Sequence, residues 1–276
     1  MDSIKEKRIR KAVDNRIKEF ADNLIKRYQK ELNEPNGVIN SKKKNIFINS
    51  LGNEFIFNSA FCRSFDSSFG NVLENLSNDI ADITFEVITE DISSYLLPQQ
   101  TQHIDYIMSD YEKHAKQPEI SDYSNFDAFI PKNIQSYTKS HVTDNHFYNP
   151  TTKEHYVIEL KAGGDLDNKK AKSEKIELLK EYFILKNELV GTDQIVRIFF
   201  ATAYNKDGEE NEWKQERVKQ FFAADELLIG KNYWNFVCDD NNGFDIIYDQ
   251  YKISSQYILS AIEVIKQMYF KGELWK

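Results

Sequence analysis

The sequence predicts one α/β domain with helical additions. Three observations support this fold class: apolar residues repeat at helical spacing near both ends, strand-forming residues gather at 141–161, and a nearly unbroken apolar run of strand length follows at 195–203. No internal repeat, low-complexity linker or clear domain boundary interrupts the pattern. We therefore expect a single domain over 1–276, divided into a helical part at 1–65, a core at 66–205 and a second helical part at 206–276.

Length and composition are those of an ordinary water-soluble protein. The chain has 276 residues, of which 41% are hydrophobic and 29% charged, so it can bury a sizeable core. No segment approaches the roughly 18 apolar residues needed to cross a bilayer, and the N-terminus lacks the apolar stretch of a secretion signal. Cys62 and Cys238 are too few for a disulfide framework. These features predict a cytoplasmic protein without a membrane segment.

Charge is unevenly distributed along the chain. The net charge is -8, yet basic residues gather in Lys5–Lys30, Lys42–Lys44 and Lys169–Lys175, while acidic residues concentrate in Asp79–Asp91 and Asp239–Asp249. A phosphate backbone responds to local charge rather than to net charge. A basic cleft on an acidic body is therefore compatible with the sequence, although solvated helix faces account equally well for any single run.

Apolar residues at helical spacing predict several helices. The first runs from Ile9 to about Leu32, and a second begins near Ser67, which can cap it. Gln99–Lys139 is polar with weak periodicity, so we expect loops with short elements there. Later helices are expected at Asn168–Leu189, Trp213–Leu228 and Tyr257–Tyr269, the last capped by Ser254 or Ser255.

A β-hairpin is expected in the middle of the chain. His155–Lys161 is rich in strand formers, and 144–148 can pair with it across the short loop Pro150–Lys153. Strand residues two apart point to the same side of a sheet, so Glu159 and Lys161 emerge together. The opposite face, which we expect to enter the core, carries Tyr156, Ile158 and Leu160.

The register of this hairpin brings two carboxylates together. If Asn149 pairs with Glu154, Asp144 lies opposite Glu159, and cross-strand neighbours have Cβ atoms about 4.5–5.5 Å apart. Like charges that close are destabilising unless a cation lies between them. Two carboxylates, waters and a phosphate oxygen suit Mg²⁺. On spacing alone, an exposed strand pair and a turn aspartate explain the residues equally well.

The chemistry expected of such a centre is phosphodiester hydrolysis. Asp144 and Glu159 would hold Mg²⁺, which acts as a Lewis acid and lowers the pKa of a bound water. Lys161 would orient that water and stabilise the negative charge of the transition state. Because Lys161 adjoins two carboxylates, its pKa should tend upward, which favours the stabilising role over that of a base.

These residues resemble a known nuclease signature. Asp144 followed by Glu159-Leu160-Lys161 resembles the motif of PD-(D/E)XK nucleases, with Thr143 where the name of the motif has proline. Longer segments look like type II restriction endonucleases of the TdeIII family, over roughly the C-terminal half. These segments are Tyr156–Ala171, Leu228–Phe236 and, more loosely, Phe69–Glu74.

The resemblance implies a fold and an activity. It implies a central mixed sheet flanked by helices, a Mg²⁺ requirement, and a homodimer that cuts both strands of double-stranded DNA at a short palindromic site. Relatives of this kind recognise GGNCC-type sequences. A repair or structure-specific nuclease of the same fold, or a non-catalytic DNA-binding module, is the alternative. The complete set of Asp144, Glu159 and Lys161 argues against a degenerate module.

Two further acidic residues enter through the resemblance. In many nucleases of this superfamily a glutamate on the first core helix adds to the metal site, and Glu74, which lies off the apolar face of its helix, is the candidate here; a solvated surface glutamate is the alternative. Asp127 competes with Asp144 for the first acidic position, since it lies in a short strand-like segment, 125–130. The hairpin register favours Asp144, because a long polar stretch separates Asp127 from Glu159.

Residues for DNA contact are expected directly after the active strand. Amides at a helix N-terminus and nearby lysines favour a phosphate, although these lysines would equally solvate the helix. The residues that begin this helix are Asn168, Lys169, Lys170 and Lys172.

Overall fold

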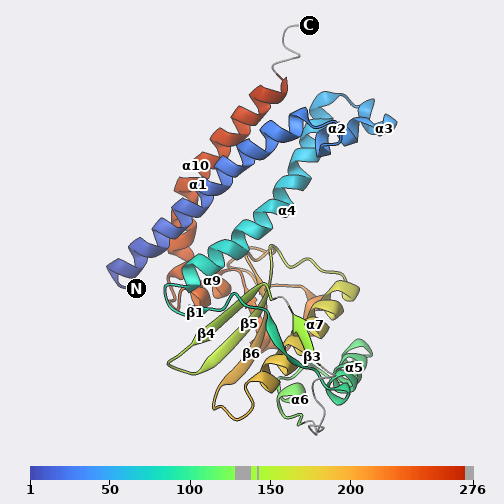
Figure 1. The fold of residues 1–276 in the computed structure, drawn as a ribbon, viewed down its shortest axis with the longest axis vertical. Coiled ribbons are helices and arrows are strands. Elements are labelled where there is room, and N and C mark those ends of the chain that lie inside the picture. The colour runs from blue at the N-terminus through green and yellow to red at the C-terminus, as the bar shows by residue number, and fades with distance from the viewer. Residues whose placement is uncertain (128–137, 142, 271–276) are drawn as a thin grey trace. The chain divides into compact units, whose positions relative to one another are not determined.

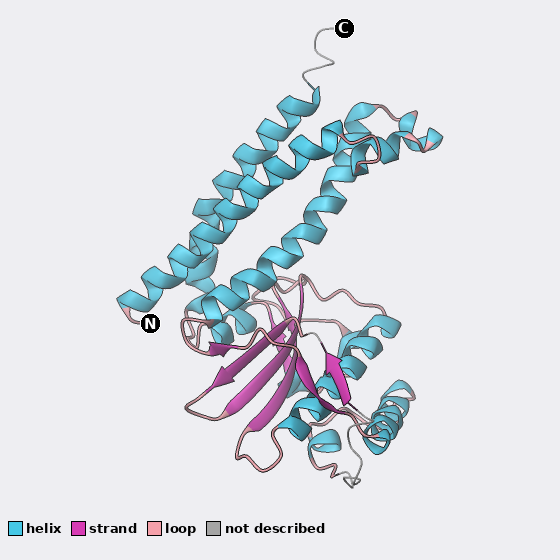
Figure 2. Ribbon diagram, in the orientation of Figure 1, coloured by secondary structure: helices cyan, strands magenta, loops and turns pink. Residues whose placement is uncertain are grey.

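The computed structural model describes residues 1–127, 138–141 and 143–270. The chain divides into two compact units: Met1–Leu76 together with the chain from Asp245 onward, and Ser77–Phe244. The first is helical and the second contains the sheets (Figure 2), so the α/β class is confirmed. The expected division at 65/66 and 205/206 stays a prediction.

The first unit consists of long helices joined by short ones (Figure 1). The first predicted helix is confirmed, whereas the next is not capped at Ser67: it begins at Asn53, and Ser67 lies within it. The last begins at Gly243, well before Tyr257, so neither Ser254 nor Ser255 is a cap; the Ser254 hydroxyl donates a 2.6 Å hydrogen bond to Asp14 instead. The helices are α1 (Ser3–Asn33), α2 (Val38–Lys43), α3 (Ile46–Asn49), α4 (Asn53–Ala81) and α10 (Gly243–Phe270).

Aromatic side chains form the core of this helical unit. Phe20 of α1 contacts Phe65 of α4 with ring centroids 5.5 Å apart, and Phe57 of α4 contacts Tyr269 of α10 at 4.9 Å. Phe57 and Phe65 lie on one face of α4, two turns of helix apart. The aromatic residues that α4 buries begin upstream of Ser67. The helix therefore also begins upstream of Ser67, because these residues must lie on one helical face to reach the core.

The second unit is built on a mixed five-stranded sheet in the order β1-β4-β5-β6-β7. The first two strand pairs are antiparallel and the last two are parallel, as the resemblance implied. A separate antiparallel pair consists of β2 (Ile92–Tyr95) and β3 (Thr138–His141). The strands of the main sheet are β1 (Glu86–Val87), β4 (Asn145–Asn149), β5 (Glu154–Lys161), β6 (Ile195–Thr202) and β7 (Leu227–Ile229).

Helices cover this sheet. The expected helix after the active strand is confirmed, and it provides the crossover that the parallel strands β5 and β6 require. Gln99–Lys139 contains a long helix rather than loops alone, and Trp213–Leu228 is not one helix: its last residues enter strand β7 beside β6. The helices are α5 (Pro98–Glu112), α6 (Ser121–Ser124), α7 (Asn168–Glu188), α8 (Glu216–Lys219), the 3₁₀ turn η2 (Ala224–Glu226) and α9 (Lys231–Val237).

Both faces of strand β5 are covered. Tyr156, Ile158 and Leu160 are buried as expected, and the Tyr156 ring packs against Phe236 of α9. The opposite face is buried too, since Val157 is 0% exposed and belongs to the core that α7 contributes to. Glu159 and Lys161 therefore emerge beneath a helix rather than on an open surface.

No helix in the described part of the chain has the length and apolar character that spanning a membrane requires.

Candidate active site

The hairpin that carries the candidate site has the expected register. Asn149 pairs with Glu154 and Asn145 with Ile158, so one further step along the antiparallel ladder places Asp144 opposite Glu159. The side chain of Asn149 accepts hydrogen bonds from the amides of Thr151 and Thr152 at 3.0 and 3.3 Å. This local turn chemistry fixes the loop length and with it the register.

Lys161 contacts two carboxylates. Its ammonium forms an ion pair with Glu159 Oε1, from the same face of β5. It also lies 3.3 Å from Oε1 of Glu174 on α7. The side chains of Glu159, Glu174 and Lys161 are 16%, 23% and 30% exposed, respectively, so the cluster is sheltered but reaches solvent. Sequence reasoning missed Glu174.

Burial and mutual repulsion change the acidity of these groups. Burial, followed by the negative charge of Asp144, raises the pKa of Glu159 to about 8, against the influence of Lys161. Burial alone would lower the pKa of Lys161, but Glu159, Glu174 and Asp144 outweigh it and the pKa is raised. The expected direction for Lys161 is therefore confirmed, and the ammonium stays charged at neutral pH.

A further buried carboxylate lies on the same helix. Glu181 of α7 is only 4% exposed. Burial, then the charges of Glu159 and Asp144, raises the pKa of Glu181 to about 8. The sensitivity of Glu159 and Glu181 to the same aspartate indicates a region of strongly negative potential under α7. Such a region favours a cation.

The described residues contain no group of three or more histidine, cysteine, aspartate or glutamate side chains already arranged to hold a metal ion. A centre that takes Mg²⁺ here would rely on two carboxylates. Asp144 and Glu159 supply hard oxygen donors from neighbouring strands, and Mg²⁺ commonly keeps several waters and binds one or two protein carboxylates. The donor chemistry of the pair therefore fits the ion.

The other acidic residues singled out from the sequence lie elsewhere. Asp127 has a 96% exposed side chain whose carboxylate is 3.8 Å from Lys186; it follows α6 without regular structure, and residues 128–130 of the expected strand lie outside the described residues. Glu74 is half-buried on α4, in the helical unit. Its part in a metal site stays a prediction.

The lysines of α7 have different environments. Lys169 and Lys170 are exposed, like Asn168 beside them, whereas the ammonium of Lys172 pairs with Glu112 at 2.8 Å. The backbone amide of Lys170 donates to the capping side chain of Asp167, so this amide is not available to a DNA phosphate.

Lys175, which the sequence placed in the same basic run, is buried. Its side chain is 1% exposed and pairs with Glu226 at 2.5 Å, and its ammonium lies over the rings of Tyr123 and Phe222. It holds α7 to the segment before β7 and cannot contribute to a basic DNA-binding surface.

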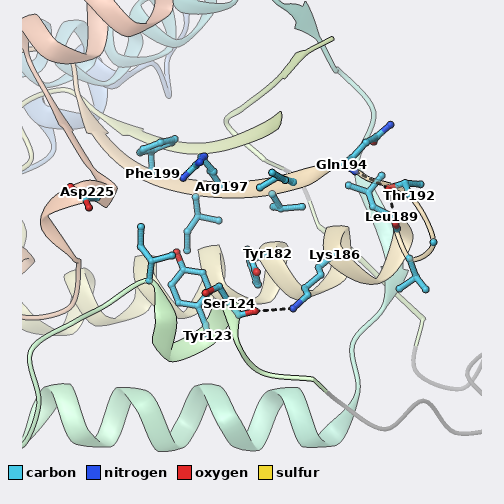
Figure 3. A pocket seen from close by; sticks show the side chains of 16 residues that line it. Tyr123, Ser124, Tyr182, Lys186, Leu189, Thr192, Gln194, Arg197, Phe199 and Asp225 are labelled. Atoms are coloured by element: carbon cyan, nitrogen blue, oxygen red, sulfur yellow. Dashed lines mark hydrogen bonds between the residues drawn. The ribbon is translucent and has the colours of Figure 1, made fainter. Parts of the chain in front are cut away.

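A separate pocket lies between the first part of β6 and the second half of α7 (Figure 3). Lys186 points across it and donates a 3.1 Å hydrogen bond to the carbonyl of Ser124. Its described lining does not include Asp144, Glu159 or Lys161. The hollow is therefore distinct from the candidate catalytic residues.

Comparison with known proteins identifies one family. Residues 5–255 match the family model described as type II restriction endonuclease, HinfI. No curated protein and no solved structure matches the chain. The type II class expected from the resemblance is confirmed, whereas the TdeIII-like subtype is not.

Proposed function

Because the chain belongs to the HinfI family of type II restriction endonucleases, we propose that it cleaves DNA at a Mg²⁺ centre formed by Asp144, Glu159 and Lys161. The family makes it a DNA hydrolase that acts on double-stranded DNA. The observation that carries the choice of residues is the hairpin register, which sets Asp144 opposite Glu159 with Lys161 beside it.

Each residue has a distinct task in this proposal. Asp144 and Glu159 would hold the ion, which supplies Lewis acidity at the scissile phosphate and acidifies a water. Lys161, charged because its pKa is raised, donates hydrogen bonds to a phosphate oxygen as negative charge develops there. The cover of α7 limits the access of water to this cluster, which strengthens these electrostatic contacts.

Binding and assembly complete the proposal. Lys169 and Lys170 are free to reach phosphates at the exposed start of α7. The described residues contain one such centre per chain, so cutting both strands of a palindrome is best served by a homodimer with one centre on each strand. A GGNCC-like target remains part of the proposal through the resemblance to relatives.

The first test is cleavage of plasmid DNA by the purified full chain, with Mg²⁺ or with EDTA. We expect discrete fragments that EDTA abolishes. A smear or structure-dependent nicking would favour a repair nuclease, and binding without cleavage would favour a non-catalytic module; each contradicts the proposal.

The second test concerns the residues. Asp144→Asn, Glu159→Gln and Lys161→Ala should each reduce cleavage at least about 100-fold while the far-ultraviolet circular dichroism stays unchanged. Asp127→Asn is the matched control, because Asp127 is exposed and pairs with Lys186. Full activity of Asp144→Asn together with an inactive Asp127→Asn would overturn the assignment. Glu74→Gln in the same series tests whether Glu74 adds to the metal site.

A further inference from the structure

We propose that Glu174 is a positioning residue, which holds the ammonium of Lys161 at the reaction centre when a cation occupies Glu159. The inference rests on the proposed function. It starts from the geometry of Lys161, whose Nζ contacts Glu159 from its own strand and lies 3.3 Å from Glu174 Oε1 on α7. The lysine is therefore held from two independent elements of the fold.

Glu159 has two tasks that compete. Its Oε1 pairs with Lys161, and the same carboxylate is a proposed ligand of Mg²⁺. A divalent ion on Glu159 would offset part of the negative charge that attracts the ammonium, because a cation bound to the carboxylate repels a second cation nearby. Lys161 then needs a second anchor.

Glu174 supplies that anchor from helix α7 rather than from strand β5. A lysine side chain has many rotamers, and ordering it costs conformational entropy. The Lys161 side chain is 30% exposed, so solvent is open to it as an alternative. A carboxylate fixed on the helix above keeps the ammonium near the cluster, where it can meet the scissile phosphate.

The fold places Glu174 for this role. It lies on the same helix as the buried Leu178 and Leu179, which fix α7 against the sheet, and its own side chain is 23% exposed. Glu177, one turn further along, pairs with Lys180 at 2.8 Å instead. Two glutamates on one helix thus have different partners, which provides a matched control.

The kinetic test compares Glu174→Ala, Glu174→Gln and Glu177→Gln under single-turnover conditions with cognate DNA. Loss of a charge-assisted contact to Lys161 should lower the cleavage rate about 10-fold to 100-fold in Glu174→Ala, with little change in KM. Glu174→Gln should retain part of the rate, because its amide oxygen still accepts a hydrogen bond. An unchanged rate in Glu174→Ala, or an equal loss in Glu177→Gln, would overturn the inference.

The binding test separates positioning from metal ligation. Mn²⁺ binding to the full chain without DNA is measured by electron paramagnetic resonance for Glu174→Ala, in the wild-type background and in Lys161→Ala. A positioning residue acts through the lysine, so in the Lys161→Ala background the substitution should leave the Kd for Mn²⁺ unchanged within about 2-fold. Weaker Mn²⁺ binding in both backgrounds would mean that Glu174 is itself a ligand.

Failure of this inference is distinguishable from failure of the proposed function. Normal cleavage by Glu159→Gln would refute the proposed centre, whatever Glu174 does. Loss of cleavage in Glu159→Gln with a fully active Glu174→Ala would refute only the role of Glu174.

Discussion

Replacing Glu181 by glutamine should stabilise the protein above neutral pH and have little effect in acid. Glu181 is 4% exposed on α7, and burial together with the charges of Glu159, Asp144, Glu177 and Glu174 raises its pKa to about 8. Glutamine has nearly the shape of the protonated acid but never ionises. The substitution therefore removes a titration and leaves the packing in place.

The size and sign of the effect follow from proton linkage. Below the reference pKa of 4.5 both the folded and the unfolded chain hold the proton, so the ionisation of Glu181 does not change the free energy of unfolding. Between 4.5 and about 8 the unfolded chain releases the proton while the folded chain keeps it, so stability falls as pH rises, by about 1.4 kcal/mol per unit at most. Over the whole range from pH 4.5 to about pH 8, the free energy of unfolding falls by at most roughly 5 kcal/mol.

Urea unfolding between pH 5 and pH 8.5, with EDTA present, measures this effect. The stability gained in Glu181→Gln should be below about 1 kcal/mol at pH 5 and should grow to about 2–4 kcal/mol at pH 8.5. Glu188→Gln, an exposed position at the end of α7, should show no such trend. A gain that stays constant with pH, or shrinks as pH rises, would refute the linkage argument.

Three other predictions follow from buried or charged positions. Glu226→Ala should lower the free energy of unfolding by about 3–5 kcal/mol, since it leaves its buried lysine partner uncompensated; urea unfolding measures this. Gly164→Ala should cost about 2 kcal/mol, because φ is +67° and a Cβ would lie 2.5 Å from Thr202 Cγ2, and Thr202→Ser should recover part of the loss in thermal unfolding. Replacing Lys169 and Lys170 by alanine should make the negative slope of the logarithm of the DNA association constant against the logarithm of the salt concentration shallower by about two. A DNA-binding titration at several salt concentrations measures this slope.

The hairpin could be predicted because its determinants are local. The turn residues fix the loop, the loop fixes the register, and the register sets Asp144 opposite Glu159. None of these steps requires knowledge of the rest of the chain. The helix after the active strand was predictable for the same reason, since its cap and its apolar spacing are contiguous in sequence.

Contacts made across the fold could not be obtained in this way. The sequence of α7 shows glutamates that a solvated helix would also carry, and only the packing of α7 over β5 brings Glu174 to Lys161 and buries Glu181. The same packing buries Lys175 against Glu226. Spacing of Glu174 and Glu181 by seven residues marks a shared helix face, but not which face meets the sheet.

The charge of the centre connects the cation to the substrate. Glu159 and Glu174 contact the Lys161 ammonium, and burial together with the negative charge of Asp144 raises the pKa of Glu159. A DNA phosphate that approached this cluster alone would be repelled, because Coulomb interactions are strong beneath a covering helix. In the proposed mechanism, Asp144 and Glu159 would hold a divalent ion that reverses the sign of that interaction, and Glu174 would keep Lys161 in place to add to it. In this mechanism, productive binding of the DNA phosphate therefore depends on binding of the metal ion.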